Sequence, residues 1–222
     1  MTTYRELLLT VVLVALIITI NAGSIRYTPE RKQAICSNNL RQIYAATISY
    51  CQDHDGTLPL YLYRRPKKWT YWYNRLLNYI DSPSSFYCPS HPKGKMQFPE
   101  DQRDERDELL PVSLDDWYLS YGMNSNLAQD YNPARPTSPR FPFKLQKITN
   151  PGHVVGYGDS NTWQLRANKW NWSKDYLPCH EGRFHVVFMD GTVRSCGKDN
   201  LSLMHAFDGW SEDTTQWSNW KD

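Results

Sequence analysis

Histidine and carboxylate side chains in the last third of the chain are the residues best suited to chemistry. His180 is followed by nine residues and then by Asp190-Gly191, with Asp159 upstream and His185 between them. Carboxylates together with backbone carbonyls can hold Ca²⁺, an ion that needs several oxygen ligands. The structural alternative is that Asp190 serves a tight turn and His180 hydrogen-bonds the loop that it begins. The sequence therefore offers Asp159, His180 and Asp190 as metal candidates, with Ca²⁺ as the ion.

The sequence lacks the motifs of well-known catalytic sites. It contains no Gly-x-Ser-x-Gly elbow, no His-Glu-x-x-His pair and no phosphate-binding loop. Its five cysteines form no Cys-x-x-Cys pair, so a zinc ribbon is not expected. We therefore predict a chain that is not an enzyme and, apart from the Ca²⁺ alternative, has no cofactor. The rival hypothesis is an envelope hydrolase that uses His180 and Asp190.

A single acid, Glu6, borders an apolar stretch near the N-terminus. No charged residue occurs from Leu7 to Ile20. A carboxylate beside hydrocarbon is costly unless it is paired or protonated, so an acid at this place suggests a function. A helix over Leu7–Ala22 would be about 24 Å long, slightly short of the ~30 Å hydrocarbon core of a bilayer. We expect a hydrophobic transmembrane helix within residues 1–25, followed by a globular head over residues 26–222.

Two alternatives remain for this N-terminal stretch. One is a secretory signal peptide with a small-residue cleavage site at Asn21-Ala22-Gly23. The other is a plain single-pass anchor. The acid Glu6 and the weak basic flank, which contains only Arg5, argue against the signal peptide.

Composition limits the classes of partner. The chain has 25 Lys and Arg residues against 23 Asp and Glu residues, a net charge of +2 that argues against a strong nucleic-acid binder. The 9 Trp and 15 Tyr residues suit protein interfaces and sugar platforms. An anchored or secreted carbohydrate-binding module is therefore a second rival hypothesis. A head outside the cytoplasmic membrane would carry one or two disulfides; the connectivity stays open, and we favour Cys36 with Cys88.

The hydrophobic pattern indicates the elements that position these residues. Apolar side chains recur at three and four residues after Thr28-Pro29, which predicts an amphipathic helix over residues 29–52. A second short helix is predicted over Trp69–Ile80, and strands over 116–122, 144–148, 154–158 and 183–189. Asp190-Gly191 indicates a C-terminal hairpin over residues 183–196. The expected fold class is α+β, with a long N-terminal hydrophobic helix packed on a small antiparallel sheet with long loops.

The N-terminus resembles that of type IV pilins and type II secretion pseudopilins. If Met1 is removed, Thr2 becomes the first residue and Glu6 the fifth, ahead of the aliphatic run. In that family the glutamate is thought to meet the amino terminus of the adjacent subunit. The usual leader ends in Gly followed by Phe, and Met1 stands where the Gly would be. Either the leader lies upstream of Met1, or the cleavage motif of this chain is degenerate.

A second resemblance runs in order through most of the chain. Cys36-Ser-Asn-Asn-Leu40, Phe86-Tyr-Cys88-Pro-Ser90, Gly158-Asp-Ser160 and the pair His180 and Asp190-Gly191 are similar to the H-X9-DG prepilin-type proteins (DUF1559). The resemblance implies a pseudopilin-like subunit of a type II secretion or type IV pilus-like filament. It also implies a single pass of the bacterial inner membrane, a periplasmic or extracellular head, and partners that are copies of itself, other pseudopilins and a prepilin peptidase.

Overall fold

The computed structural model describes residues 4–6, 8–13, 28–60, 62–65, 68–92, 119–125, 127, 144–148, 150–165 and 176–197. Among these residues, the longest helix is α2 (Pro29–Asp53). The Thr28 hydroxyl accepts a hydrogen bond from the Arg31 N–H at 3.3 Å, and Pro29 occupies the first turn, where no amide hydrogen is needed. One stripe of the helix is buried and consists of Cys36, Asn39, Leu40, Ile43, Ala46, Thr47, Tyr50 and Cys51. The helix thus lies where the sequence pattern places it.

A five-stranded sheet, in the order β5-β3-β4-β6-β7, forms the other main layer. The strands are β3 (Tyr121–Asn124), β4 (Val155–Asp159), β5 (Gln164–Leu165), β6 (Phe184–Phe188) and β7 (Val193–Cys196). β4 pairs antiparallel with β3 and with β6, β6 pairs antiparallel with β7, and β5 pairs parallel with β3. β6 and β7 form a hairpin closed by Asp190-Gly191, as the sequence predicts.

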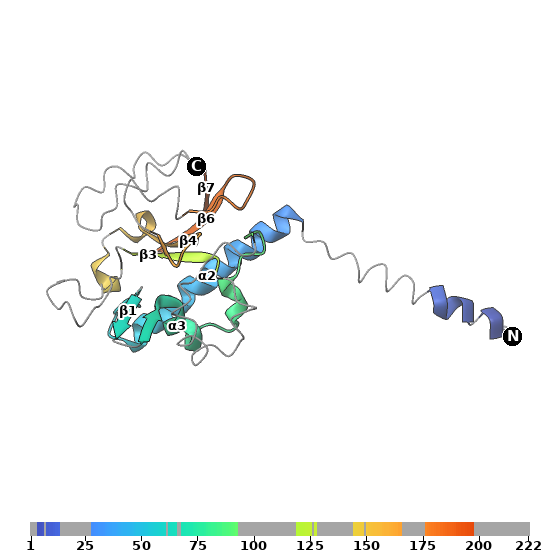
Figure 1. Cartoon of the computed structure of the whole chain (residues 1–222), viewed down its shortest axis with the longest axis horizontal. Coiled ribbons are helices and arrows are strands. Elements are labelled where there is room, and N and C mark those ends of the chain that lie inside the picture. Colours follow the sequence, from blue (N-terminus) through green and yellow to red (C-terminus); the bar gives the residue numbers. More distant parts are fainter. Residues whose placement is uncertain are drawn as a thin grey trace.

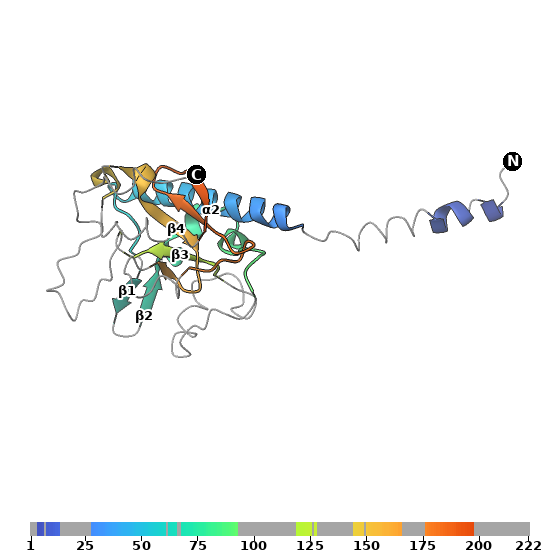
Figure 2. The same ribbon diagram turned by 90° about the horizontal axis from the view of Figure 1, so that it is seen from above.

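Helix α2 packs against the sheet and also against the segment that follows it (Figures 1 and 2). On the sheet side it contacts β4 and β6, and the hydroxyls of Thr47 and Tyr157 lie 2.7 Å apart. It also contacts α3 (Trp72–Leu76), η1 (Leu77–Tyr79) and η2 (Pro83–Phe86). A separate antiparallel ribbon, β1 (Leu62–Arg65) with β2 (Lys68–Tyr71), leads into α3.

Both faces of the central strands are buried. Tyr157 and Val187 belong to the main core together with α2, whereas Val155, Val186 and Phe188 belong to a second apolar cluster. Alternation separates the two sets on β6, whereas on β4 a bulge between Val155 and Tyr157 interrupts the alternation, so these two residues face different clusters. Asp159 follows Tyr157 by two residues beyond the bulge, and His185 precedes Val187 by two, so both lie on the face that α2 covers.

The expectation of an antiparallel sheet is wrong, because the sheet is mixed. β5 returns beside β3 after a tight turn, and the amides of Met123 and Ser125 donate to the carbonyls of Trp163 and Leu165 at 3.1 and 3.0 Å. The Trp72 indole N–H donates to the same Trp163 carbonyl at 2.7 Å. A strand of two residues carries no alternation that a sequence pattern could reveal.

The expected long apolar N-terminal helix packed on the sheet is also wrong. The helix that covers the sheet is the amphipathic α2, and at the N-terminus the structure describes only short helical stretches, residues 4–6 and 8–13. Figures 1 and 2 draw these stretches apart from the sheet, and their large apolar side chains are exposed. The described residues include no helix that is both long enough and apolar enough to span a bilayer. Physically, the sheet needs only one apolar stripe to cover it, and α2 supplies that stripe.

Two smaller expectations fail for local reasons. Trp69–Ile80 is divided among the end of β2, the five-residue helix α3 and the 3-10 turn η1. Residues 144–148 contain the 3-10 turn η5 (Leu145–Lys147) instead of a strand. Another 3-10 turn, η6 (Pro151–His153), leads into β4.

Candidate functional site

A buried cluster of ionisable side chains surrounds Asp159 at the end of β4. Its Oδ2 atom accepts a hydrogen bond from the His185 backbone N–H at 2.6 Å and lies 3.1 Å from His180 Nε2. His185 Nδ1 lies 3.6 Å from the same oxygen. Relative exposure is 0% for Asp159, 2% for His180 and 4% for His185. A carboxylate and two imidazoles are therefore held together away from bulk solvent.

The sheet and one tight turn position these three groups. Asp159 ends β4 and His185 lies in the neighbouring strand β6, so the pairing of the two strands brings them together. His180 precedes β6 and exchanges two backbone hydrogen bonds of 2.9 Å with Arg183. The turn between them uses Glu181 and Gly182 at positive φ of 53° and 82°. This turn folds the His180 ring back over His185, with ring centroids 4.2 Å apart.

Two cysteine sulfurs complete the cluster. Cys88 Sγ lies 3.4 Å from His180 Nε2 and 4.0 Å from Cys179 Sγ. One donor atom from each of Cys88, Asp159, Cys179 and His180 lies within 4.8 Å of the other three. Cys88 is also joined by a disulfide to Cys36 of α2, the pair favoured from the sequence. The cluster is thus fastened to the helix as well as to the sheet.

Burial and hydrogen bonding act in opposite directions on the carboxylate. Burial alone would raise the pKa of Asp159, but hydrogen bonds from His180 and His185 outweigh it and lower the pKa below its ordinary value. For Cys179, burial raises the pKa of the thiol, and the charge on Asp159 adds to the effect. An ionised carboxylate beside a protonated thiol is a poor arrangement for a cysteine nucleophile, which needs a lowered thiol pKa.

Some polar atoms of the cluster have no hydrogen-bond partner. Asp159 Oδ1 and His180 Nδ1 are buried and unpartnered. Buried polar atoms are almost always satisfied, so unpartnered ones need an explanation.

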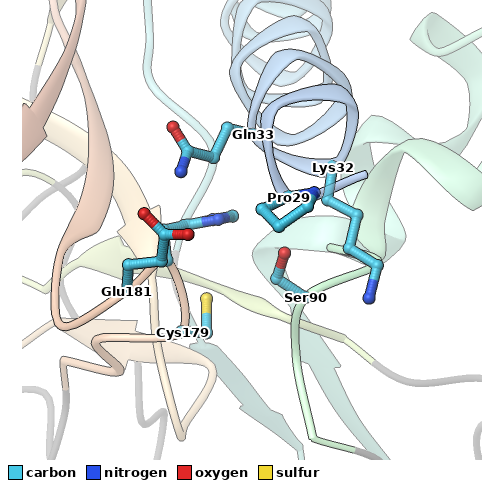
Figure 3. A pocket seen from close by; sticks show the side chains of 7 residues that line it. Pro29, Lys32, Gln33, Ser90, Cys179 and Glu181 are labelled. Atoms are coloured by element: carbon cyan, nitrogen blue, oxygen red, sulfur yellow. The ribbon is translucent and has the colours of Figure 1, made fainter. Parts of the chain in front are cut away.

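A pocket opens beside the cluster, between the start of α2 and the segment before β6 (Figure 3). Its volume is about 220 Å³, and its lining residues are Pro29, Lys32, Gln33, Ser90, Cys179, His180 and Glu181. Figure 3 shows Cys179 and Glu181 on one side of the space and Pro29, Lys32 and Gln33 of α2 across it. The half-buried Cys179 is thus reached from outside, whereas Asp159 lies deeper.

The structure brings together two of the three metal candidates and separates the third. Asp159 and His180 meet, but Asp190 lies in the β6–β7 turn, where its Oδ1 accepts the Thr192 N–H at 2.8 Å. Gly191 adopts a positive φ of 86° and packs against Tyr44 of α2. With one carboxylate, two cysteine sulfurs and one imidazole, the cluster around Asp159 does not match the oxygen ligands that Ca²⁺ prefers.

The remaining sequence candidates lie outside this cluster. Glu6 is an exposed residue of the N-terminal helical stretch, and its carbonyl accepts the Thr10 hydroxyl at 2.8 Å. Thr2 lies outside the described residues. Among the aromatic residues, Tyr71, Trp72 and Tyr73 are each 1% exposed or less, so they form core and not a sugar platform.

Sequence reasoning missed the cysteines of the cluster. Cys179 is adjacent to His180, and that adjacency was the one available signal, but Cys88 lies 91 residues from Cys179. Only the fold brings them together. In comparisons with known proteins, no family model, no curated protein and no solved structure matches the chain.

Proposed function

We propose that the protein is a non-enzymatic, pseudopilin-like structural subunit of a type II secretion or type IV pilus-like filament. In this proposal the apolar N-terminal segment holds the chain at the bacterial inner membrane and contacts other subunits. The head, built from α2 and the mixed sheet, lies on the periplasmic side or on the filament surface. The function is one of assembly, and the buried Asp159 cluster stabilises the head.

The exposure of apolar side chains near the N-terminus is the observation that carries this proposal. The large exposed side chains are Tyr4 at 79%, Leu8 at 51%, Leu9 at 68%, Val11 at 62%, Val12 at 49% and Leu13 at 63%. A helical stretch exposed in this way on all sides is unfavourable in water and favours contact with lipid or with another apolar helix. Since no membrane-spanning helix is found among the described residues, the support comes from this exposure and from the uncharged sequence Leu7–Ile20.

The disulfide supports the placement of the head. Disulfides persist in the periplasm and outside the cell, whereas cytosolic thiols are kept reduced. The bond between Cys36 and Cys88 joins α2 to the segment after η2. An oxidising compartment for residues 28–197 agrees with a subunit whose head has left the cytoplasm.

In the proposed assembly, Glu6 neutralises the amino terminus of a neighbouring copy. An unpaired carboxylate in an apolar contact is expensive, and an α-amino group is the partner with opposite charge that every added subunit would bring. The pair would set the axial position of one subunit against the next. A prepilin peptidase that exposes Thr2 as the new N-terminus would create that partner.

Replacing Glu6 with Gln tests this role. We expect Glu6→Gln to leave the chain in the membrane fraction but to abolish the ladder of oligomers that chemical cross-linking gives with the wild type. The matched control is Asp81→Asn, which removes an exposed carboxylate from the head and should leave the ladder unchanged.

Two results would contradict the proposal. A wild-type chain recovered wholly in the soluble fraction would exclude membrane attachment. An unchanged ladder from Glu6→Gln would exclude the charge-neutralising role of Glu6. Sequencing the mature N-terminus distinguishes the rivals, since a start at Thr2 supports pilin-type processing and a start near Gly23 supports a signal peptide.

A further inference from the structure

Three of the six distances among the donor atoms of Cys88, Cys179, His180 and Asp159 match the edges of a tetrahedral metal site, and the other three are at most 4.8 Å. The two sulfurs of Cys88 and Cys179 lie 4.0 Å apart, Cys88 Sγ lies 3.4 Å from His180 Nε2, and His180 Nε2 lies 3.1 Å from Asp159 Oδ2. Zinc bonds of about 2.3 Å to sulfur and about 2.0 Å to nitrogen or oxygen give tetrahedral edges of roughly 3.8, 3.5 and 3.3 Å respectively. All three observed distances are within a few tenths of an ångström of these edges.

The chemistry of the donors selects the metal. Two thiolates, an imidazole and a carboxylate suit Zn²⁺, which binds sulfur and nitrogen readily, and do not suit Ca²⁺ or Mg²⁺. The Asp159 carboxylate is already oriented by the His185 backbone N–H, and its second oxygen is buried without a partner. We propose that Cys88, Cys179, His180 and Asp159 form a structural zinc site that is complete only when the disulfide between Cys36 and Cys88 is reduced.

The disulfide makes the site depend on redox state, because the Cys88 sulfur cannot be bonded to Cys36 and bind zinc at the same time. A dithiol reductant would transfer two electrons and two protons to the disulfide, leaving thiols on Cys36 and Cys88 while the reductant becomes a disulfide. Zinc would then bind the sulfurs of Cys88 and Cys179 and release two protons to solvent. The oxidised head is stabilised by the covalent bond to α2, and the reduced head by the metal.

The pocket of Figure 3 supplies an entry path. Cys179 and His180 line it directly, and its remaining lining consists of Pro29, Gln33, Ser90, the carboxylate residue Glu181 and the cationic residue Lys32. A hydrated cation can therefore approach two of the four ligands before it loses its last waters. This step needs no movement of the sheet, because His180 and Cys179 precede β6.

Metal binding by the full-length chain in detergent tests the proposal. The chain, stripped of metal by a chelator, is incubated with Zn²⁺ either oxidised or after reduction with a phosphine, desalted, and assayed for bound zinc by mass spectrometry. We expect one zinc per chain after reduction and none in the oxidised protein. Co²⁺ in place of Zn²⁺ should give the visible absorption of a tetrahedral ion and a thiolate charge-transfer band.

Cysteine variants separate this site from non-specific binding. Cys179→Ala should lower zinc affinity at least about 100-fold, since it removes a ligand. Cys51→Ala removes a buried free thiol of α2 outside the cluster and should bind like the wild type. Cys36→Ser releases Cys88 from its disulfide and should bind zinc without any reductant.

Several outcomes would overturn the proposal. These are equal zinc binding by oxidised protein, a charge-transfer band that survives in Cys179→Ala, and a folded reduced wild type that takes up no zinc. A reduced wild type that loses its near-ultraviolet circular dichroism and does not regain it when zinc is added overturns it as well. If Cys36→Ser fails to fold, the zinc content of the reduced wild type decides whether the proposal holds.

Discussion

Gly191 shows how one residue joins the C-terminal hairpin to helix α2. It has a positive φ of 86°, and a Cβ atom at this position would lie 2.8 Å from Tyr44 Cε1. The Tyr44 hydroxyl also donates a hydrogen bond to the Met189 carbonyl at 3.2 Å. The Asp190-Gly191 pair therefore closes the turn and also leaves room for the tyrosine that holds the turn against the helix.

Gly191→Ala should lower the free energy of unfolding by about 2 kcal/mol or more, from backbone strain and from the clash with Tyr44. Gly182→Ala is the matched control, because Gly182 has a φ of 82° but nothing within 4 Å of an added Cβ. Gly182→Ala should therefore show the backbone strain without a clash, and its free energy of unfolding should fall by less than that of Gly191→Ala. Urea unfolding of the full chain measures both. Equal losses in the two variants would contradict the role given to Tyr44.

At the level of residues, the sequence could predict what is local and could not predict what is distant. Asp190-Gly191 was predicted as a hairpin turn because its two residue types favour that turn by themselves. The meeting of Asp159 with His180 and with Cys88 depends on strand pairing and on a disulfide between distant segments. The H-x9-D-G spacing suggested that His180 and Asp190 act together, yet the structure assigns them to different places.

Tyr157 joins two elements, since it lies on β4 and its hydroxyl meets that of Thr47 on α2 at 2.7 Å. It is fully buried, and burial raises its pKa above the ordinary value of 10.0. A folded state that holds this proton more tightly than the unfolded state is stabilised below about pH 10 and loses that stability as pH rises further.

Tyr157→Phe should therefore change how stability depends on alkaline pH. Above about pH 10 the free energy of unfolding of the wild type should fall by about 1.4 kcal/mol per pH unit more than that of the variant. The reason is that the wild type releases one more proton on unfolding, the proton of the Tyr157 hydroxyl. At neutral pH the variant should be less stable by about 1 kcal/mol for the lost hydrogen bond. Denaturant unfolding at several pH values measures both effects.

Tyr4→Phe is the control for this measurement. Tyr4 is 79% exposed and lies outside α2 and the sheet, so its replacement leaves the packing of the head unchanged. It should keep the wild-type dependence on pH. If Tyr157→Phe also keeps it, the buried hydroxyl does not contribute as described.

At the level of elements, periodicity revealed long elements and missed short ones. The 25 residues of α2 repeat their apolar stripe many times, and the strands β4 and β6 are apolar runs beside glycine or a strong turn. β5 has two residues and η5 three, too few for any period. The helix predicted over Trp69–Ile80 is wrong because the same apolar spacing is also compatible with the end of a strand followed by a single helical turn.

For the whole molecule, the decisive question is what the apolar N-terminal stretch contacts. The sequence predicted a long helix packed on the sheet, but α2 covers the sheet, and the described residues 8–13 have exposed side chains. An apolar stretch can be recognised from composition, whereas its partner cannot, because lipid and another apolar helix favour the same side chains.

The double replacement Leu9→Asp with Val12→Asp tests that contact. Both side chains are exposed in the structure, at 68% and 49%, so the changes should leave the fold of the head intact. Each carboxylate costs up to about 3 kcal/mol in the centre of a bilayer, so even partial burial should move most of the chain from the membrane pellet to the supernatant. Gln52→Asp, at an exposed position of α2, adds a charge to the head and should leave the distribution unchanged. If the double variant stays in the pellet while its far-ultraviolet circular dichroism matches the wild type, the N-terminal stretch is not the attachment, and a surface of the head must be.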